Sequence, residues 1–200
     1  MITLNKELIE KHIITLSPIS PQLKPCGNLN QPIAGVLFDV YGTLFVSASG
    51  DIGAAKTKTQ KHHKIRQLLE KYNINKSPEN LLQALYGRIE KKHEELRKKG
   101  IDFPEVEIDN IWLDILETNE HQSIQQFAIE FELIVNPVYP MPHLRELLRT
   151  LKQQGMLMGI ISNAQFFTPY LFDWFLGSDL RHLGFHPNLI FWSFQLKHAK

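Results

Sequence analysis

The sequence has little cysteine, no long apolar run and almost no net charge, and each absence excludes a class of protein. A single cysteine, Cys26, rules out a disulfide within the chain and is typical of a reducing compartment. No stretch is apolar enough to predict a membrane-spanning helix. The N-terminus mixes lysine and glutamate into its apolar residues and does not predict a secretory signal. We therefore expect a cytoplasmic protein with no membrane partner.

The charge balance points away from nucleic acids. The chain has 22 lysines and arginines against 21 aspartates and glutamates, which gives a formal net charge of +1. Binding to a phosphate backbone would favour a clear excess of positive charge. The locally basic residues 56–66 are interpreted as a solvated helix start, with steering of anionic substrates as the alternative. We expect no nucleic-acid partner.

Apolar residues are plentiful, and their pattern divides the chain into blocks. Hydrophobic residues make up 43% of the 200 positions, which is enough for a sizeable core. Residues 1–31 form an N-terminal extension that we expect to be peripheral. Residues 32–50 and 136–200 predict an α/β core. Residues 51–135, with helical periodicity and no strong strand signal, predict an inserted all-helical cap.

Short apolar runs predict the strands of the core. They are residues 33–40 (IAGVLFDV), 156–162 (MLMGIIS) and 188–193 (NLIFWS). Runs of this length, bounded by turn residues, are typical of strands buried on both faces of a parallel sheet. Helical patterns separate the later strands, as in residues 144–155. The fold class expected is α/β, a doubly wound parallel sheet with a Rossmann-like core.

Within the helical block, the sequence indicates the apolar face of one helix and the first residue of the next. Ile65, Leu68 and Leu69 share one face of a predicted helix, and Ser77 followed by Pro78 predicts the start of the next one. Further helices are expected around residues 108–118 and 123–134.

Each predicted strand ends in a polar group. The first ends at Asp39, the second at Ser162 and Asn163, and the third at Ser193, seven residues before Lys200. Because ligands bind beyond the carboxyl ends of parallel strands, we expect these groups to share one crevice. Taken singly, turn formation, helix capping or a solvated terminal lysine explains each of them.

Together these groups have the chemistry to attack and hold an anionic substrate. Asp39 is ionised at neutral pH and needs no base to act as a nucleophile, so it would form a covalent aspartyl intermediate. Ser162, Asn163 and backbone N–H groups of the turn after Asp39 would hold the anionic oxygens of the substrate. Lys200 would offset the negative charge.

The motifs resemble, in order, those of the haloacid dehalogenase-like (HAD) superfamily. They are LFDVYGTL at residues 37–44, GIISN at residues 159–163 and SFQLKHAK at residues 193–200. The helical block lies where that family inserts a helical cap. The resemblance implies a hydrolase in which Asp39 is the nucleophile and Thr43 the threonine of the first motif. It also implies that Ser162 binds the substrate anion and that Lys200 stabilises charge.

One position within the first motif divides the family. Tyr41, two residues after Asp39, is by this resemblance a third candidate catalytic residue. At this position the phosphatase branches usually have an acid–base aspartate and the dehalogenase branch a tyrosine. The resemblance therefore implies a hydrolase of a small anionic substrate. A phosphate ester is favoured because that activity is the commonest in the family, and a 2-haloacid is the alternative. A Mg²⁺ cofactor is implied, with Asp39 and the backbone carbonyl of Tyr41 as ligands.

The fourth motif of the family is missing from this sequence, which ends at Lys200. In the family this motif supplies the acids that complete the Mg²⁺ site, on a strand beside the first strand. We therefore expect an unpaired edge on the first strand and self-association through it. The third alternative follows: an inactive, truncated remnant that binds a partner through this open edge.

Overall fold

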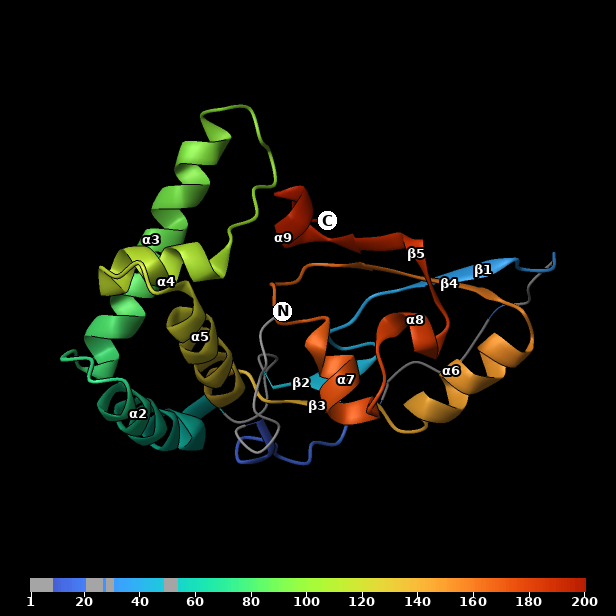
Figure 1. Cartoon of the computed structure of the whole chain (residues 1–200), viewed down its shortest axis with the longest axis horizontal. Helices are drawn as coiled ribbons and strands as arrows, with labels where there is room; N and C mark the ends of the chain where they lie inside the picture. The colour runs from blue at the N-terminus through green and yellow to red at the C-terminus, as the bar shows by residue number, and fades with distance from the viewer. Residues whose placement is uncertain (1–8, 21–26, 28–30, 49–53) are drawn as a thin grey trace.

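The computed structural model describes residues 9–20, 27, 31–48 and 54–200. Cys26, part of the N-terminal extension and the boundary expected between residues 50 and 51 lie outside these ranges. The chain is mixed α/β, with a group of helices beside a group of strands (Figure 1). The first group, residues 54–135, is called the helical unit, and residues 31–48 with 136–200 form the sheet unit.

The helices and strands follow one another along the chain as β1 (Gly35–Phe38), β2 (Phe45–Ser47), α2 (Ala54–Lys71), α3 (Pro78–Arg97), α4 (Ile108–Leu116), α5 (His121–Val135), β3 (Val138–Pro140), α6 (Leu144–Gln153), β4 (Leu157–Ser162), α7 (Tyr170–Leu176), α8 (Leu180–Leu183), β5 (Phe185–Trp192) and α9 (Ser193–Leu196).

The three predicted strands form one parallel sheet in the order β1-β4-β5. Phe38 at the end of β1 pairs with Ile160, and Ser162 at the end of β4 pairs with Trp192. Gly159 permits the close approach of β5, because a Cβ at this position would lie 2.5 Å from the carbonyl oxygen of Leu189. The register brings the carboxyl ends of the strands to one edge.

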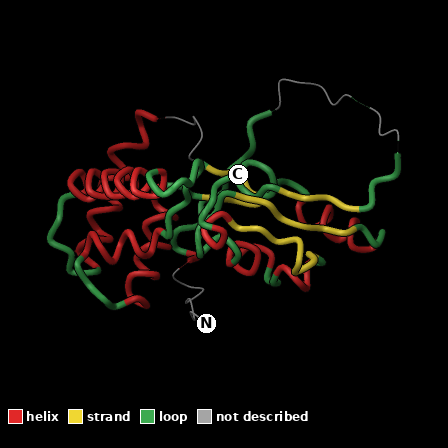
Figure 2. The backbone as a smooth tube through the Cα atoms, turned by 90° about the horizontal axis from the view of Figure 1, so that it is seen from above, coloured by secondary structure: helices red, strands yellow, loops and turns green. Residues whose placement is uncertain are grey.

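Helices cover one face of this sheet. Phe38 and Ile160 are buried against Leu148 of α6 and Phe172 of α7. The view from above in Figure 2 looks onto the strands, with the helices of the sheet unit beneath them.

The opposite face is apolar and open to solvent in the described residues. Leu37 on β1 is 55% exposed, and Leu157 and Ile161 on β4 are 50% and 42% exposed. The expectation that the first strand is buried on both faces is therefore wrong. An uninterrupted apolar run does not distinguish a covered face from an open one.

A second, two-stranded sheet was not predicted from the sequence. β2 and β3 pair antiparallel, with Val46 opposite Tyr139. Each strand has three residues, too few to produce a recognisable period. This pair lies where the chain passes between the sheet unit and the helical unit.

The helical unit has an apolar core of its own. The predicted face of α2 is confirmed, since Ile65, Leu68 and Leu69 are buried. The predicted start of α3 is also confirmed, because the Ser77 hydroxyl accepts a hydrogen bond from the Asn80 backbone N–H at 3.1 Å. Among the described residues, no helix combines the length and apolarity needed to cross a bilayer.

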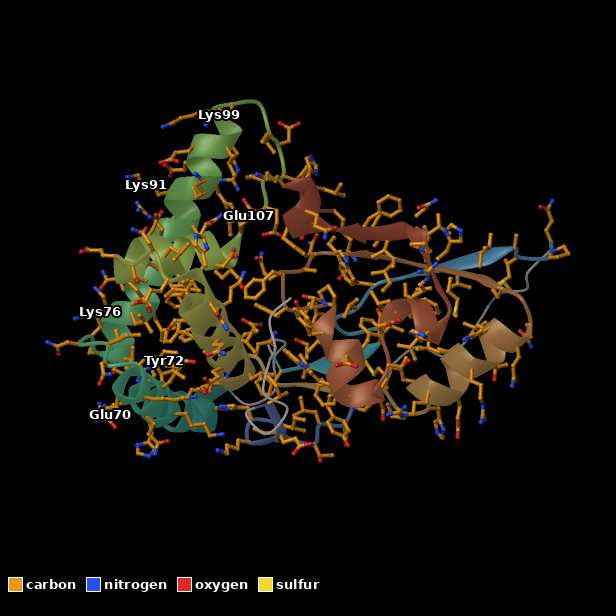
Figure 3. The ribbon with its side chains drawn as sticks, in the orientation of Figure 1. Glu70, Tyr72, Lys76, Lys91, Lys99 and Glu107 are labelled. Atoms are coloured by element: carbon orange, nitrogen blue, oxygen red, sulfur yellow. The ribbon has the colours of Figure 1, made fainter. Side chains whose placement is uncertain are left out.

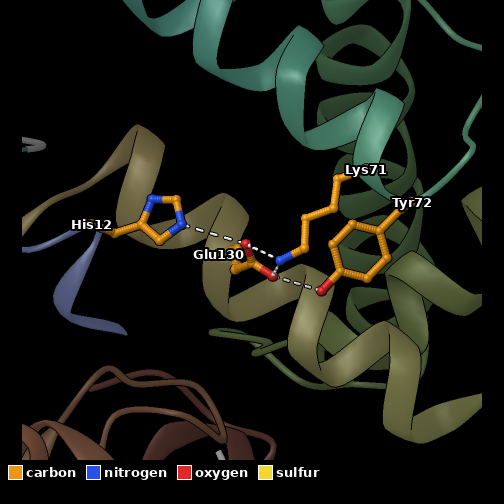
Figure 4. Close-up of polar contacts among 4 residues, drawn as sticks. All are labelled: His12, Lys71, Tyr72 and Glu130. Atoms are coloured by element: carbon orange, nitrogen blue, oxygen red, sulfur yellow. Dashed lines mark hydrogen bonds and ion pairs between the residues drawn. The ribbon is translucent and has the colours of Figure 1, made fainter. Parts of the chain in front are cut away.

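Most of the described residues of the N-terminal extension are exposed, and Ile9 is the one among them that is fully buried. Ile9 is only 1% exposed. His12 lies 3.4 Å from the carboxylate of Glu130, a residue of α5 that is itself 2% exposed (Figure 4). Lys71 and Tyr72 donate hydrogen bonds to the same carboxylate at 2.6 and 2.7 Å.

This arrangement stabilises the charged form of Glu130. Burial alone would raise the pKa of the carboxyl group. The hydrogen bonds from His12, Lys71 and Tyr72, with the charge of Lys71, outweigh burial and lower the pKa to about 2. Burial, and then the adjacent carboxylate, raise the pKa of Tyr72, so its hydroxyl stays a donor.

Glu130→Gln should remove a pH-dependent part of the stability. Because the folded-state pKa of about 2 lies below the ordinary 4.5, the contribution of Glu130 is present above pH 4.5 and is lost as the pH falls toward 2. We expect the variant to lose about 1–3 kcal/mol of unfolding free energy at pH 7. In urea titrations at several pH values, its unfolding free energy should fall less steeply below pH 4.5 than that of the wild type. The control is Glu70→Gln, at an exposed position of α2 (Figure 3). Equal acid limbs in wild type and Glu130→Gln would contradict the assignment.

Candidate active site

Four of the residues predicted at the strand ends lie together. The Asp39 carboxylate, just beyond β1, is 2.7 Å from the Lys200 ammonium group. Ser162, at the end of β4, is 3% exposed, lowers the pKa of Asp39 and donates to the Asn163 carbonyl oxygen at 3.2 Å. Asn163 accepts a hydrogen bond from the Lys200 backbone N–H through its Oδ1 atom at 2.8 Å. The parallel register therefore gathers an acid, a hydroxyl, an amide and an amine at one edge of the sheet.

A tight turn after β1 fixes the position of Asp39. The carbonyl oxygen of Val40 accepts hydrogen bonds from the backbone N–H groups of Leu44 and Phe45, both at 2.9 Å. Gly42 permits this turn with a φ of +78°, in the region that favours glycine. Thr43 lies in the same turn with an exposed side chain.

The surroundings of Asp39 favour its ionised form. Partial burial would raise the pKa of this carboxyl group, but hydrogen bonds from Lys200, Ser162 and the Val40 backbone, together with the charge of Lys200, hold the pKa below its usual value. The carboxylate remains 35% exposed. Asp39 is thus an ionised, accessible carboxylate at neutral pH, as a nucleophile must be.

The side chain of Tyr41 points into the protein interior. Its hydroxyl is hydrogen-bonded to the hydroxyl of Thr168, a residue with no exposed surface, at a distance of 2.9 Å. Burial, and then the charge of nearby Glu132, raise the pKa of Tyr41. The hydroxyl is therefore poorly suited to exchange protons at the strand ends, and the predicted catalytic role of this side chain has no geometric support.

The residues around Asp39 do not fit a resident Mg²⁺ ion. Mg²⁺ prefers near-octahedral oxygen ligands with one or two carboxylates. Here one carboxylate oxygen of Asp39 contacts the Lys200 ammonium group, and the other accepts the Val40 N–H at 2.9 Å. In the part of the chain that the structure describes, no three acids, histidines or cysteines group to hold a metal. The Mg²⁺ cofactor stays a prediction.

Two further residues join the helical unit to this edge of the sheet, and neither was predicted. Glu105, which precedes α4, accepts a hydrogen bond from the Ser193 hydroxyl at 2.6 Å and one from Gln165 at 3.1 Å. The Gln165 side chain also accepts from the Ile108 backbone N–H at 3.0 Å. Gln165 follows GIISN closely, which could have drawn attention to it. No local pattern marks Glu105, because its partners are distant in sequence.

A cavity of about 690 Å³ lies next to Glu105, mainly between residues of the helical unit. Glu105 and Lys197 line it, as do Lys91 of α3 and Glu107 before α4, both labelled in Figure 3. Lys197 lies 3.4 Å from the Glu107 carboxylate, so charges of both signs meet in the wall. Asp39 does not line this cavity, although Glu105 connects the cavity wall to Ser193.

No family model matches the chain, and searches of curated proteins and of solved structures find no significant match. The geometry of Asp39, Ser162, Asn163 and Lys200 is therefore the basis on which a function can be proposed.

Lys200→Met should raise the pKa of Asp39, because it removes both a hydrogen bond and a positive charge from the carboxylate. The pKa can be followed by ¹³C NMR of the Asp39 carboxyl group during a pH titration. Lys197→Met is the matched control, since Lys197 is three residues away and pairs with Glu107 instead. An Asp39 pKa that does not change in Lys200→Met, or that changes equally in both variants, would show that the contact does not form in solution.

Proposed function

We propose that this protein is a HAD-like hydrolase that acts on a small anionic substrate through a covalent aspartyl intermediate at Asp39. The finer architecture, a doubly wound core with residues 51–135 as its cap, is part of the same proposal. The observation that supports it most is the contact between Asp39 and Lys200, with Ser162 and Asn163 beside them.

The reaction would proceed in two steps. In the first, an oxygen of the Asp39 carboxylate attacks the electrophilic centre, a new bond to this oxygen forms, and the leaving group departs with the electrons of the broken bond. In the second, water hydrolyses the aspartyl intermediate and regenerates the carboxylate. The Lys200 ammonium group would balance the negative charge of the substrate and of the transition state.

Ser162 and Asn163 would bind the substrate anion. The Ser162 hydroxyl donates to the Asn163 carbonyl oxygen at 3.2 Å and also lowers the pKa of Asp39, so it would be near a substrate oxygen placed beside the nucleophile. The Oδ1 atom of Asn163 accepts from the Lys200 backbone, which leaves its Nδ2 atom as the donor toward a substrate. Donors preorganised on strand ends lose little entropy when the substrate binds.

The resemblance favours a phosphate ester as the substrate, whereas one contact favours the alternative. An alkoxide leaving group needs a proton, and the hydroxyl of Tyr41, two residues after Asp39, is bound to Thr168. A halide leaving group needs no proton, so the position of Tyr41 supports carbon–halogen hydrolysis of a 2-haloacid. Both substrates share the same attack by Asp39 and the same anion contacts.

Asp39→Asn should lower the turnover rate by a factor of about 10³ or more, because an uncharged amide is a poor nucleophile. The measurement is a panel of phosphate esters and 2-haloacids, each assayed with and without EDTA. Loss of activity in EDTA would indicate a metal-dependent phosphatase, and halide release that is insensitive to EDTA would indicate the dehalogenase. Asp173→Asn, at an exposed position of α7, is the control. Full activity in Asp39→Asn would refute the assignment of the nucleophile.

A second candidate function is partner binding through the open edge of β1, including self-association. β1 is an edge strand of the described sheet, and its four residues include no charge and no proline. The other edge strand, β5, contains Pro187, and its pairing with β4 is irregular, which are features that protect an edge. The exposed side chain of Leu37 extends this unprotected edge onto the open face of the sheet.

Leu37→Lys should weaken association through this edge, since a lysine on an edge strand disfavours pairing with another strand. Sedimentation velocity over a range of concentrations measures the association. The control Tyr86→Lys changes a residue of α3 that is 65% exposed and lies in the other unit. If the wild-type chain sediments as a monomer at every concentration, self-association is ruled out.

A further inference from the structure

The N-terminal segment, residues 9–18, contacts both units of the protein. Ile9 is 1% exposed and packs with Ile129 and Leu133 of α5, in the helical unit. The same small cluster includes Phe167, which belongs to the sheet unit and is 5% exposed. A side chain buried between two units restrains the movement of one against the other.

A polar contact fixes the segment on the helical unit. His12 lies 3.4 Å from Glu130, and Lys71 on the last turn of α2 donates to both oxygens of the same carboxylate (Figure 4). Because Glu130 is held by α2 as well, its position does not depend on the segment. It is a preformed anchor for His12.

The segment then continues along the sheet unit. Residues 15–18 line a groove of about 530 Å³ together with residues 139–146 and Phe175. In Figure 1 the blue segment passes beneath α5 and then toward α7. The segment therefore runs from an anchor on the helical unit to a groove on the sheet unit.

We propose that residues 9–18 are an intramolecular tether that holds the helical unit against the sheet unit and sets its position above the strand ends. The chain passes between the units near Ser47 and Asn136, whose side chains are hydrogen-bonded at 2.8 Å, so movement of the helical unit would pivot there. The tether adds a connection away from this pivot, besides the contacts of Glu105 with Gln165 and Ser193 that join the units at the strand ends. It also contacts Phe167, four residues after Asn163, and so restrains the loop that follows the candidate site.

The test compares Ile9→Ser with Ile19→Ser in the full chain. Ile19 is 73% exposed and serves as the matched control. Fluorophores on Lys91→Cys in α3 and Arg149→Cys in α6, with Cys26→Ser, report the distance between the two units by single-molecule energy transfer. The tether predicts a broader distance distribution in Ile9→Ser and an unchanged one in Ile19→Ser. Identical distributions in all three proteins would overturn the proposal.

Hydrogen exchange of the unmodified chain provides a second test that does not require the Ile9 variant to fold. The amide of His12 is bonded to the carbonyl of Ile9 at 2.9 Å, and that of Thr168 to the carbonyl of Gln165 at 2.9 Å. If the tether opens as one unit with the loop, both amides should respond equally to low urea concentrations. Protection of Thr168 that persists after His12 exchanges at least tenfold faster would overturn the proposal. Neither measurement uses a substrate, so the tether can fail or hold independently of the proposed hydrolase.

Discussion

The contact between the Asp39 carboxylate and the Lys200 ammonium group is the interaction on which the functional account depends. Its two partners are 35% and 42% exposed, and an ion pair this accessible adds little to stability. The fold therefore does not require it. Its importance is chemical, because it keeps an ionised carboxylate beside a positive charge, where the proposed hydrolase would hold and attack an anionic substrate.

The parallel sheet makes this contact possible. β1, β4 and β5 run in one direction, so the side chains that follow them meet, although Asp39 lies more than a hundred residues before Ser162 in the sequence. The turn stabilised by the Val40 carbonyl then fixes the direction of Asp39. Helices α6 and α7 on one face of the sheet supply the packing, and Glu105 and Gln165 connect the helical unit to the same edge. The strand ends and the neighbouring unit therefore meet at one edge of the sheet.

Local signals were sufficient for much of this arrangement. The apolar runs predicted the strands of the parallel sheet, and the polar residues after them predicted which groups would meet. The Ser77 cap and the buried face of α2 also follow from local rules.

Features that depend on distant contacts were not predicted. The burial of Ile9 requires α5 and Phe167, the position of Glu105 requires Ser193, and the direction of the Tyr41 hydroxyl requires Thr168. The open face of the sheet could not be seen in the sequence either, since Leu37 and Phe38 are equally apolar and only one of them is covered.

The most direct measurement of the central claim is rapid-quench mass spectrometry of the protein during turnover of a substrate that it accepts. The account predicts a transient covalent adduct on the peptide that contains Asp39, with the mass of a phosphoryl group or of the carboxyalkyl group of a 2-haloacid. Turnover without any adduct, or with an adduct on another residue, would contradict it.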